Sequence, residues 1–220
     1  MSRQPVPHPM LADTRTDHGP AILRRLPHAP GPGNNKAGAG VTARVAEIGV
    51  CRGVLSRYLL ERLPTLHLTM VDHWRAHEPG SDAYDFDAAH QQVCNLQTPE
   101  QVADNLLAAR WVASRFANRT ELIRADSIEA AEMMDDHAFD LVFIDADHRY
   151  GSVVADIAAW ASKVRPGGWL GGHDYGLPGL NGAVDRAADE FAAREGLELE
   201  RDAFFTWFVR LPAEGGRDGD

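Results

Sequence analysis

Short apolar segments alternate with longer amphipathic segments along most of the chain beyond residue 40. The amphipathic segments follow a helical period, and they cover Gly53–Leu63, Pro99–Asn118, Ile128–Met134 and Gly151–Val164. The apolar segments are bounded by Gly, Pro or Asp, as in strands buried on both faces of a sheet, and they are Ala43–Ile48, His67–Val71, Thr120–Arg124, Leu141–Asp145 and Trp169–Gly172. This alternation predicts an α/β fold with a doubly wound, mostly parallel sheet.

The C-terminal part of the pattern differs, because two strand candidates follow one another without a helix between them. A helical pattern covers Asn181–Glu195, and the strand candidates are Leu197–Arg201 and Thr206–Leu211. We therefore expect a seven-stranded sheet with an antiparallel edge hairpin, built from residues 41–212 as one domain.

Three segments are expected to lie outside this core. Residues 1–40 are rich in Pro and Gly and predict a flexible arm, with one or two helical turns around Ala21–Leu26. Residues 74–97 form a long insertion, which predicts a lid or substrate loop. Residues 213–220 predict a frayed tail. An arm of this kind can reach a second copy, so a homodimer is one option.

Composition narrows the classes of function. The chain has 220 residues, 44% of them hydrophobic, and a formal net charge of −10. This charge disfavours a nucleic-acid partner, since phosphate binding depends on Lys and Arg. No apolar run reaches the roughly 20 residues of a membrane span. Two cysteines and the absence of an export signal pattern fit a cytoplasmic protein. We expect a small-molecule acceptor or ligand.

Glycine and acidic residues follow several of the predicted strands. The first strand leads into Glu47–Gly53, with the spacing E-x-G-x-x-x-G, and the second ends at Asp72. Glycine lets the backbone approach a ligand closely, and an acid after the second strand can accept hydrogen bonds from ribose hydroxyls. Each feature alone also fits a packed turn or a solvated strand end. Asp145 brings a further acid to the same edge, where ligands of open α/β sheets bind.

The order of these features resembles that of class I S-adenosylmethionine-dependent methyltransferases, which have a Rossmann-like fold. The resemblance implies S-adenosyl-L-methionine as cofactor, with an acid and a small polar residue beside adenine after the third strand. The cofactor-binding residues it implies are Glu47, Gly49, Cys51, Gly53, Asp72, His73, Trp74, Asp126, Ser127 and Asp145.

The stretches Phe143–Tyr150, Val164–Gly168 and Gly172–Tyr175 are similar to one branch of that class. This branch contains small O-methyltransferases of the cephalosporin-pathway and macrocin type and, more distantly, catechol O-methyltransferases. The resemblance implies a divalent cation, Mg²⁺ or Mn²⁺, held by Asp145, His173 and Asp174. His173 departs from the usual carboxylate, which leaves a softer metal or no metal as alternatives.

By the same resemblance, His148 is the predicted general base, with Asp145 beside it and Asp147 orienting it. Imidazole suits this task because its pKa lies near neutral pH. The alternative is a loop histidine that only caps the next helix. The predicted reaction is methyl transfer to a hydroxyl of a small molecule or sugar. Two other functions stay open: a non-catalytic adenosylmethionine-binding module, and a nicotinamide-dependent oxidoreductase, which the missing G-x-G-x-x-G pattern disfavours.

Overall fold

The computed structural model describes residues 18–26, 42–83, 85 and 97–213. Most of the expected arm, much of the expected insertion and the tail from residue 214 lie outside these residues.

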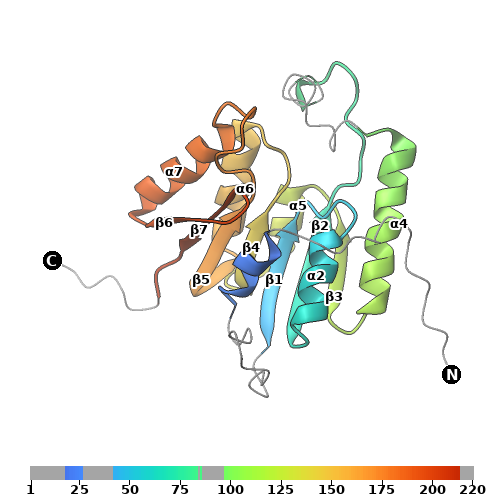
Figure 1. Ribbon diagram of the computed structural model, residues 1–220, viewed down its shortest axis with the longest axis horizontal. Coiled ribbons are helices and arrows are strands. Elements are labelled where there is room, and N and C mark those ends of the chain that lie inside the picture. The colour runs from blue at the N-terminus through green and yellow to red at the C-terminus, as the bar shows by residue number, and fades with distance from the viewer. Residues whose placement is uncertain (1–17, 27–41, 84, 86–96, 214–220) are drawn as a thin grey trace.

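Within the described residues, seven strands form a single sheet in the order β3-β2-β1-β4-β5-β7-β6 (Figure 1). The strands from β1 to β5 pair in parallel, β7 runs antiparallel to β5, and β6 runs antiparallel to β7. The predicted mixed sheet with an antiparallel edge hairpin is confirmed. The strands are β1 (Ala43–Ile48), β2 (Leu66–Asp72), β3 (Thr120–Arg124), β4 (Phe139–Ile144), β5 (Val164–Gly172), β6 (Leu199–Asp202) and β7 (Thr206–Arg210).

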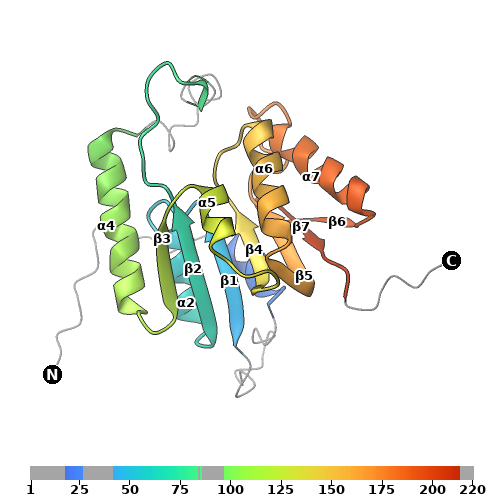
Figure 2. The same ribbon diagram turned by 180° about the vertical axis from the view of Figure 1, so that it is seen from behind.

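Helices cover both faces of the sheet and form two separate cores (Figures 1 and 2). One core contains side chains of α1 (Gly19–Leu23), α2 (Val54–Arg62) and α4 (Pro99–Arg115). The other contains side chains of α5 (Ser127–Glu132), α6 (Tyr150–Ala161) and α7 (Ala183–Glu195). Alternate residues of β1 belong to different cores, as Val45 and Ala46 show. This two-sided burial explains the continuous apolar runs in the sequence.

Two strands begin two or more residues earlier than the sequence pattern predicts, and β2 begins one residue earlier, at Leu66. β4 begins at Phe139 rather than Leu141, and its pairing with β5 shifts register between these two residues. β5 begins at Val164 rather than Trp169, although it contains Pro166 and Gly167. The Gly167 amide donates to the carbonyl of Leu211, the residue after β7, at 3.1 Å. This hydrogen bond ties the irregular first part of β5 to the edge hairpin.

The described part of the expected arm packs into the domain. Residues 18–26 contain α1, which begins two residues before the predicted helical turns, and Ala21, Ile22 and Leu26 are buried in the first core. The expectation of an arm outside the core therefore fails for this segment, because its few apolar residues all point to one side.

Glycines allow the edge hairpin to pack closely beside β5. A Cβ at Gly171 would lie 2.2 Å from Phe208 Cδ1, and one at Gly172 would lie 2.6 Å from the Ile144 carbonyl oxygen. These contacts place the end of β5, and the residues that follow it, next to the end of β4. Among the described helices, none is long and apolar enough to cross a membrane.

Candidate active site

The turn between β1 and α2 lies directly against the end of β4. Gly49 has a φ of 93°, and its amide donates to the Val71 carbonyl at 2.9 Å. A Cβ at Gly49 would lie 1.9 Å from the Asp145 carbonyl oxygen, where no side chain fits. Gly53 has a φ of 76° and begins α2 in the left-handed region. Gly49 thus lets the turn approach the backbone of Asp145 closely, whereas Gly53 supplies the left-handed backbone conformation at the start of α2.

A cavity of about 390 Å³ opens beside this turn, at the carboxyl ends of β1, β2 and β4. Its volume is typical of a small-molecule site. The predicted cofactor residues that line it are Gly49, Cys51, Asp72, His73, Trp74, Asp126, Ser127 and Asp145.

Asp72 connects the two loops that form one wall of the cavity. Its Oδ2 accepts a hydrogen bond from the Cys51 amide at 2.8 Å, and its Oδ1 accepts one from the Trp74 amide at 2.7 Å. Trp74, at a φ of 42°, donates from Nε1 to the Cys51 carbonyl at 2.8 Å. Each Asp72 oxygen keeps a further lone pair, which a ribose hydroxyl can use.

The opposite wall is built around Ser127, the first residue of α5. Ser127 Oγ accepts a hydrogen bond from Trp160 Nε1 at 2.9 Å, which fixes this hydroxyl to the core. Asp156 of α6 lies beside it, and burial raises the pKa of Asp156 to about 6, although the Ser127 hydrogen bond opposes the shift. Asp126 pairs with Arg75, which also lines the cavity, with 3.0 Å between Oδ2 and Nη2.

Glu47 is not part of the cavity lining, although the sequence analysis included it among the cofactor residues. Only 2% of its surface is exposed, and its Oε2 accepts a hydrogen bond from Ser56 Oγ at 2.5 Å. Burial raises the pKa of Glu47 to about 8, against the lowering effect of that hydrogen bond. The structure therefore places Glu47 behind the glycine turn, as a support between β1 and α2.

Two histidines and two aspartates meet beside the cavity, at the ends of β4 and β5. His148 Nε2 lies 2.5 Å from Asp174 Oδ2 and 4.0 Å from Asp145 Oδ1. His173 Nδ1 lies 3.0 Å from Asp174 Oδ1 and 3.7 Å from Asp145 Oδ1. Asp174 has a φ of 64°, in the left-handed region that residues other than glycine seldom adopt. Asp145 belongs to both this cluster and the cavity lining.

The four ionisable side chains of the cluster shift one another's pKa values. Burial alone lowers the pKa of His148, but the adjacent Asp145 and Asp174 carboxylates outweigh it and raise the pKa to about 10. The same opposing effects raise the pKa of His173 to about 10. Burial would raise the pKa values of the two aspartates, but the histidines lower both. In this arrangement His148 is an imidazolium at neutral pH, which has no lone pair to accept a proton.

Asp147 does not orient His148, contrary to the sequence-based expectation. Its Oδ2 accepts hydrogen bonds from Arg149 Nε and Ser152 Oγ, each at 2.8 Å, and its Oδ1 accepts one from the Arg149 amide at 2.9 Å. Asp174 is the carboxylate that lies closest to His148. The pairing crosses from the end of β4 to the end of β5, so residue spacing could not reveal it.

The same cluster has a donor set that fits a divalent cation. Among the described residues, one ligand atom each of Asp145, His148 and Asp174 lie within 4.8 Å of one another. Two carboxylates and one imidazole suit Mn²⁺ or Fe²⁺, and the carboxylates also suit Mg²⁺. The predicted cation ligands were Asp145, His173 and Asp174, with His173 in place of His148. His173 contacts both carboxylates but is not in this closest group.

The structure adds cavity residues that the sequence did not indicate. They come from the loop after β2, from α4 and from the start of α6, and they include Arg75, His77, Gln97, Asn105, Arg149, Ser152 and Asp156. Only Asp156 had a sequence signal, because it is an acid on the buried side of an otherwise apolar helix.

A family model described as a methyltransferase domain matches residues 46–175. The chain belongs to this methyltransferase family. Its fold is that of class I methyltransferases, and S-adenosylmethionine is the cofactor of the family. A comparison with curated proteins found no match.

Solved structures share the fold at low sequence identity. A protein from Corynebacterium glutamicum is 17% identical, with a TM-score of 0.58 over 97% of this chain and 85% of its own. The O-methyltransferase NovP is 17% identical, with a TM-score of 0.58 over 89% of this chain and 79% of its own. An rRNA methylase from Streptococcus thermophilus is 11% identical, with a TM-score of 0.51 over 89% of this chain and 93% of its own. At these identities the likeness shows the fold alone, and it does not identify the acceptor.

Proposed function

We propose that this methyltransferase transfers the methyl group of S-adenosylmethionine to a hydroxyl of a small molecule or sugar, with a divalent cation at the histidine–aspartate cluster. The observation that carries the proposal is the double position of Asp145. Asp145 lines the cofactor cavity, and its carboxylate also belongs to the cluster with His148 and Asp174. A methyl donor and an oxygen acceptor would therefore meet at Asp145.

The cavity residues supply the groups that a nucleoside needs. Asp72 offers lone pairs to ribose hydroxyls, and its backbone hydrogen bonds hold the carboxylate in place before ligand arrives. Asp126 and Asp156, at the other wall, are candidates for the adenine amino group. A site fixed in this way favours transfer mainly through proximity and orientation.

The cluster supplies the groups for the acceptor. Asp145 and Asp174 are carboxylates that can hold an acceptor hydroxyl, and we assign this role first to Asp145 because it reaches the cavity. A cation held by Asp145, His148 and Asp174 would lower the pKa of that hydroxyl. His148 would bind the cation through the nitrogen that faces the two carboxylates, so it must first release the proton that they stabilise. A His148 that holds the cation cannot also accept the hydroxyl proton at that nitrogen, so its predicted role as general base applies only to the site without a cation.

Calorimetry with S-adenosylmethionine and S-adenosylhomocysteine, with and without Mn²⁺, tests the cofactor half. We expect binding in the wild type, a loss of at least about tenfold in Asp72→Ala, and no change in Asp104→Ala, which removes an exposed carboxylate from α4. Failure of both nucleosides to bind would overturn the proposal.

Methyl transfer from labelled S-adenosylmethionine to panels of sugars and phenols tests the catalytic half. Asp174→Asn should abolish transfer but retain nucleoside binding, since Asp174 does not line the cavity. If the wild type binds the cofactor and methylates no member of either panel, the alternative of a binding module without catalysis is favoured.

A further inference from the structure

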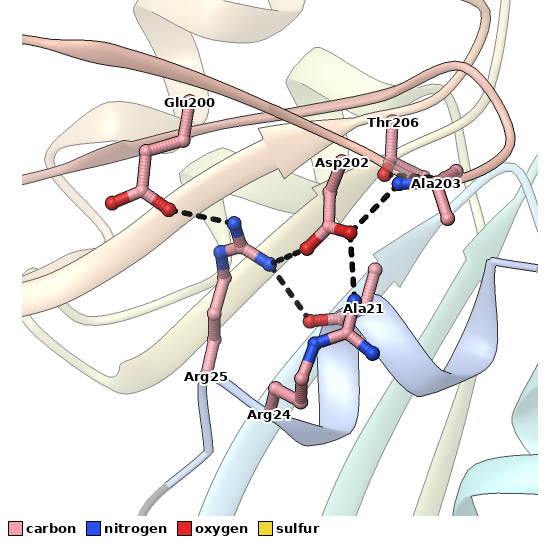
Figure 3. A network of polar contacts seen from close by, with 7 residues as sticks. All are labelled: Ala21, Arg24, Arg25, Glu200, Asp202, Ala203 and Thr206. Carbon is pink, nitrogen blue, oxygen red and sulfur yellow. Dashed lines mark hydrogen bonds and ion pairs between the residues drawn. The ribbon is translucent and has the colours of Figure 1, made fainter.

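The two residues that follow helix α1 form a group of ion pairs with β6, an edge strand of the sheet. Arg25 Nη2 lies 2.7 Å from Glu200 Oε2, and Arg25 Nη1 lies 2.7 Å from Asp202 Oδ2. Arg24 Nη2 reaches the other Asp202 oxygen, also at 2.7 Å. Figure 3 shows Arg24 and Arg25, the two residues that follow α1, directed at Asp202, which ends β6. We call the ion pairs of Arg24 and Arg25 with Glu200 and Asp202 the α1 latch.

The latch is only partly removed from water, because Arg25 is buried whereas Arg24 and Glu200 are largely exposed. Only 9% of the Arg25 side chain is exposed, and its guanidinium lies 3.8 Å from the centre of the Phe208 ring. Arg25 Nη1 also donates to the Ala21 carbonyl at 3.0 Å. Because a buried guanidinium needs its partners, the latch fixes the position of α1 relative to the hairpin.

His18, which immediately precedes α1, is thereby placed beside the catalytic cluster. The centre of its ring lies 4.7 Å from the centre of the His173 ring, with 44° between the two planes. The His18 ring is also stacked on the buried Phe143 of β4, with 6° between the planes and 5.7 Å between the centres. His18 therefore contacts both a core residue and His173.

We propose that His18 is a positioning residue for the acceptor half of the site and that the α1 latch holds it there. It fixes the plane of the His173 ring, so that Nδ1 faces Asp174 Oδ1 at 3.0 Å and Asp145 Oδ1 at 3.7 Å. His173 in turn holds the two aspartates that we assign to the cation and the acceptor. The effect of His18 on the cation and the acceptor rests on the proposed function, whereas its effect on the position of the His173 ring can be tested independently of that function.

The first test is the NMR signal of the His173 ring in protein labelled with ¹³C at histidine, without any ligand. We expect His18→Ala to shift this signal, because it removes an adjacent aromatic ring. Asp202→Asn should shift it in the same direction, because it weakens the latch from a site distant from His173. His67→Ala, an exposed histidine of β2, should leave it unchanged. An unmoved signal in His18→Ala, or in Asp202→Asn, would overturn the positioning role or the latch, respectively.

The second test is the affinity for Mn²⁺ by calorimetry. Groups that directly hold metal ligands typically contribute tenfold or more, and His173 is such a group for Asp145 and Asp174. We therefore expect Mn²⁺ binding in His18→Ala to weaken several-fold, with roughly tenfold as the upper bound. His18→Phe keeps an aromatic ring against His173 and should restore affinity to within about twofold. Equal weakening in both variants would overturn the role of ring packing.

S-adenosylhomocysteine binding separates these results from the proposed function. No residue of 18–26 lines the cofactor cavity, so all of these variants should bind the nucleoside as the wild type does. A wild type that binds neither nucleoside nor Mn²⁺ would refute the proposed function, while the His173 signal would still decide the positioning role.

Discussion

Asp156 gives the sharpest test of the electrostatics in the cofactor cavity. It is 5% exposed on α6, next to Ser127, and burial raises its pKa from 3.8 to about 6. Asn has nearly the same shape and can still accept the Ser127 hydrogen bond, but it carries no charge. Asp156→Asn therefore removes the cost of ionising this buried group and little else.

The magnitude follows from the shift in pKa. A folded-state pKa above the unfolded value means that the native protein retains the proton longer than the unfolded chain. The neutral carboxyl has its full advantage below about pH 4, and the wild type loses that advantage as pH rises from about 4 to about 6. The shift from 3.8 to about 6 corresponds to about 3 kcal/mol, of which about 2 kcal/mol is lost between about pH 4.5 and 7.

The assay is urea unfolding of the wild type and Asp156→Asn, without ligands, at several pH values between these limits. The stability of the variant relative to the wild type should increase by about 2 kcal/mol over this range and then stay constant above about pH 7. Asp135→Asn, an exposed aspartate, is the matched control and should show no such trend. A pH-independent difference between wild type and Asp156→Asn would refute the assigned burial effect.

Three further predictions concern backbone strain and burial. Gly49→Ala should weaken S-adenosylhomocysteine binding by at least about tenfold in calorimetry. The added Cβ would collide with the Asp145 carbonyl, and the positive φ would cost a further ~1–2 kcal/mol. Wild-type affinity in this variant would contradict the close approach. Phe204 and Phe205 have φ values of 58° and 57° in the turn between β6 and β7, so F204N/F205G should raise Tm by about 2–4 °C; a lower Tm would mean that their packing outweighs the strain. Glu47→Gln should gain stability over the wild type as pH rises from 4.5 to about 8, since the buried acid must ionise there; equal urea midpoints across this range would contradict the raised pKa.

The cofactor half of the site could be predicted from the sequence because its residues occupy strand ends. Asp72 ends β2, and Asp126 and Asp145 come shortly after β3 and β4; parallel strands bring their carboxyl ends to one edge. The glycine turn between β1 and α2 is also visible in the local sequence. Pattern and topology indicated the glycine turn, Asp72 and Asp145, whereas Asp126 was expected from the family resemblance.

The acceptor half could not be predicted in the same way, because its geometry depends on pairs distant in sequence. His148 faces Asp174 rather than its neighbour Asp147, and this choice depends on how the segments after β4 and β5 approach each other. The expected metal set contained His173 for the same reason: spacing identifies which residues are near the edge but not which atoms converge. Glu47 was expected to bind the cofactor because of its place in the glycine motif, but its carboxylate accepts a buried hydrogen bond from Ser56 instead.

The placement of α1 shows how strongly distant contacts can act on the site. Residues 18–26 have a weak helical pattern and several prolines nearby, and such a segment has little tendency to form a stable helix by itself. Its order in the fold comes from the buried side chain of Ile22 and from Arg25, whose partners lie more than 170 positions further along the chain. The hairpin that closes the sheet thus also fixes the segment that carries His18 to His173. The cofactor edge depends on the ends of the parallel strands, whereas the position of His18 beside the cluster also depends on the contacts of Arg24 and Arg25 with β6. A change in these contacts can therefore alter the acceptor side while the cofactor cavity keeps its lining.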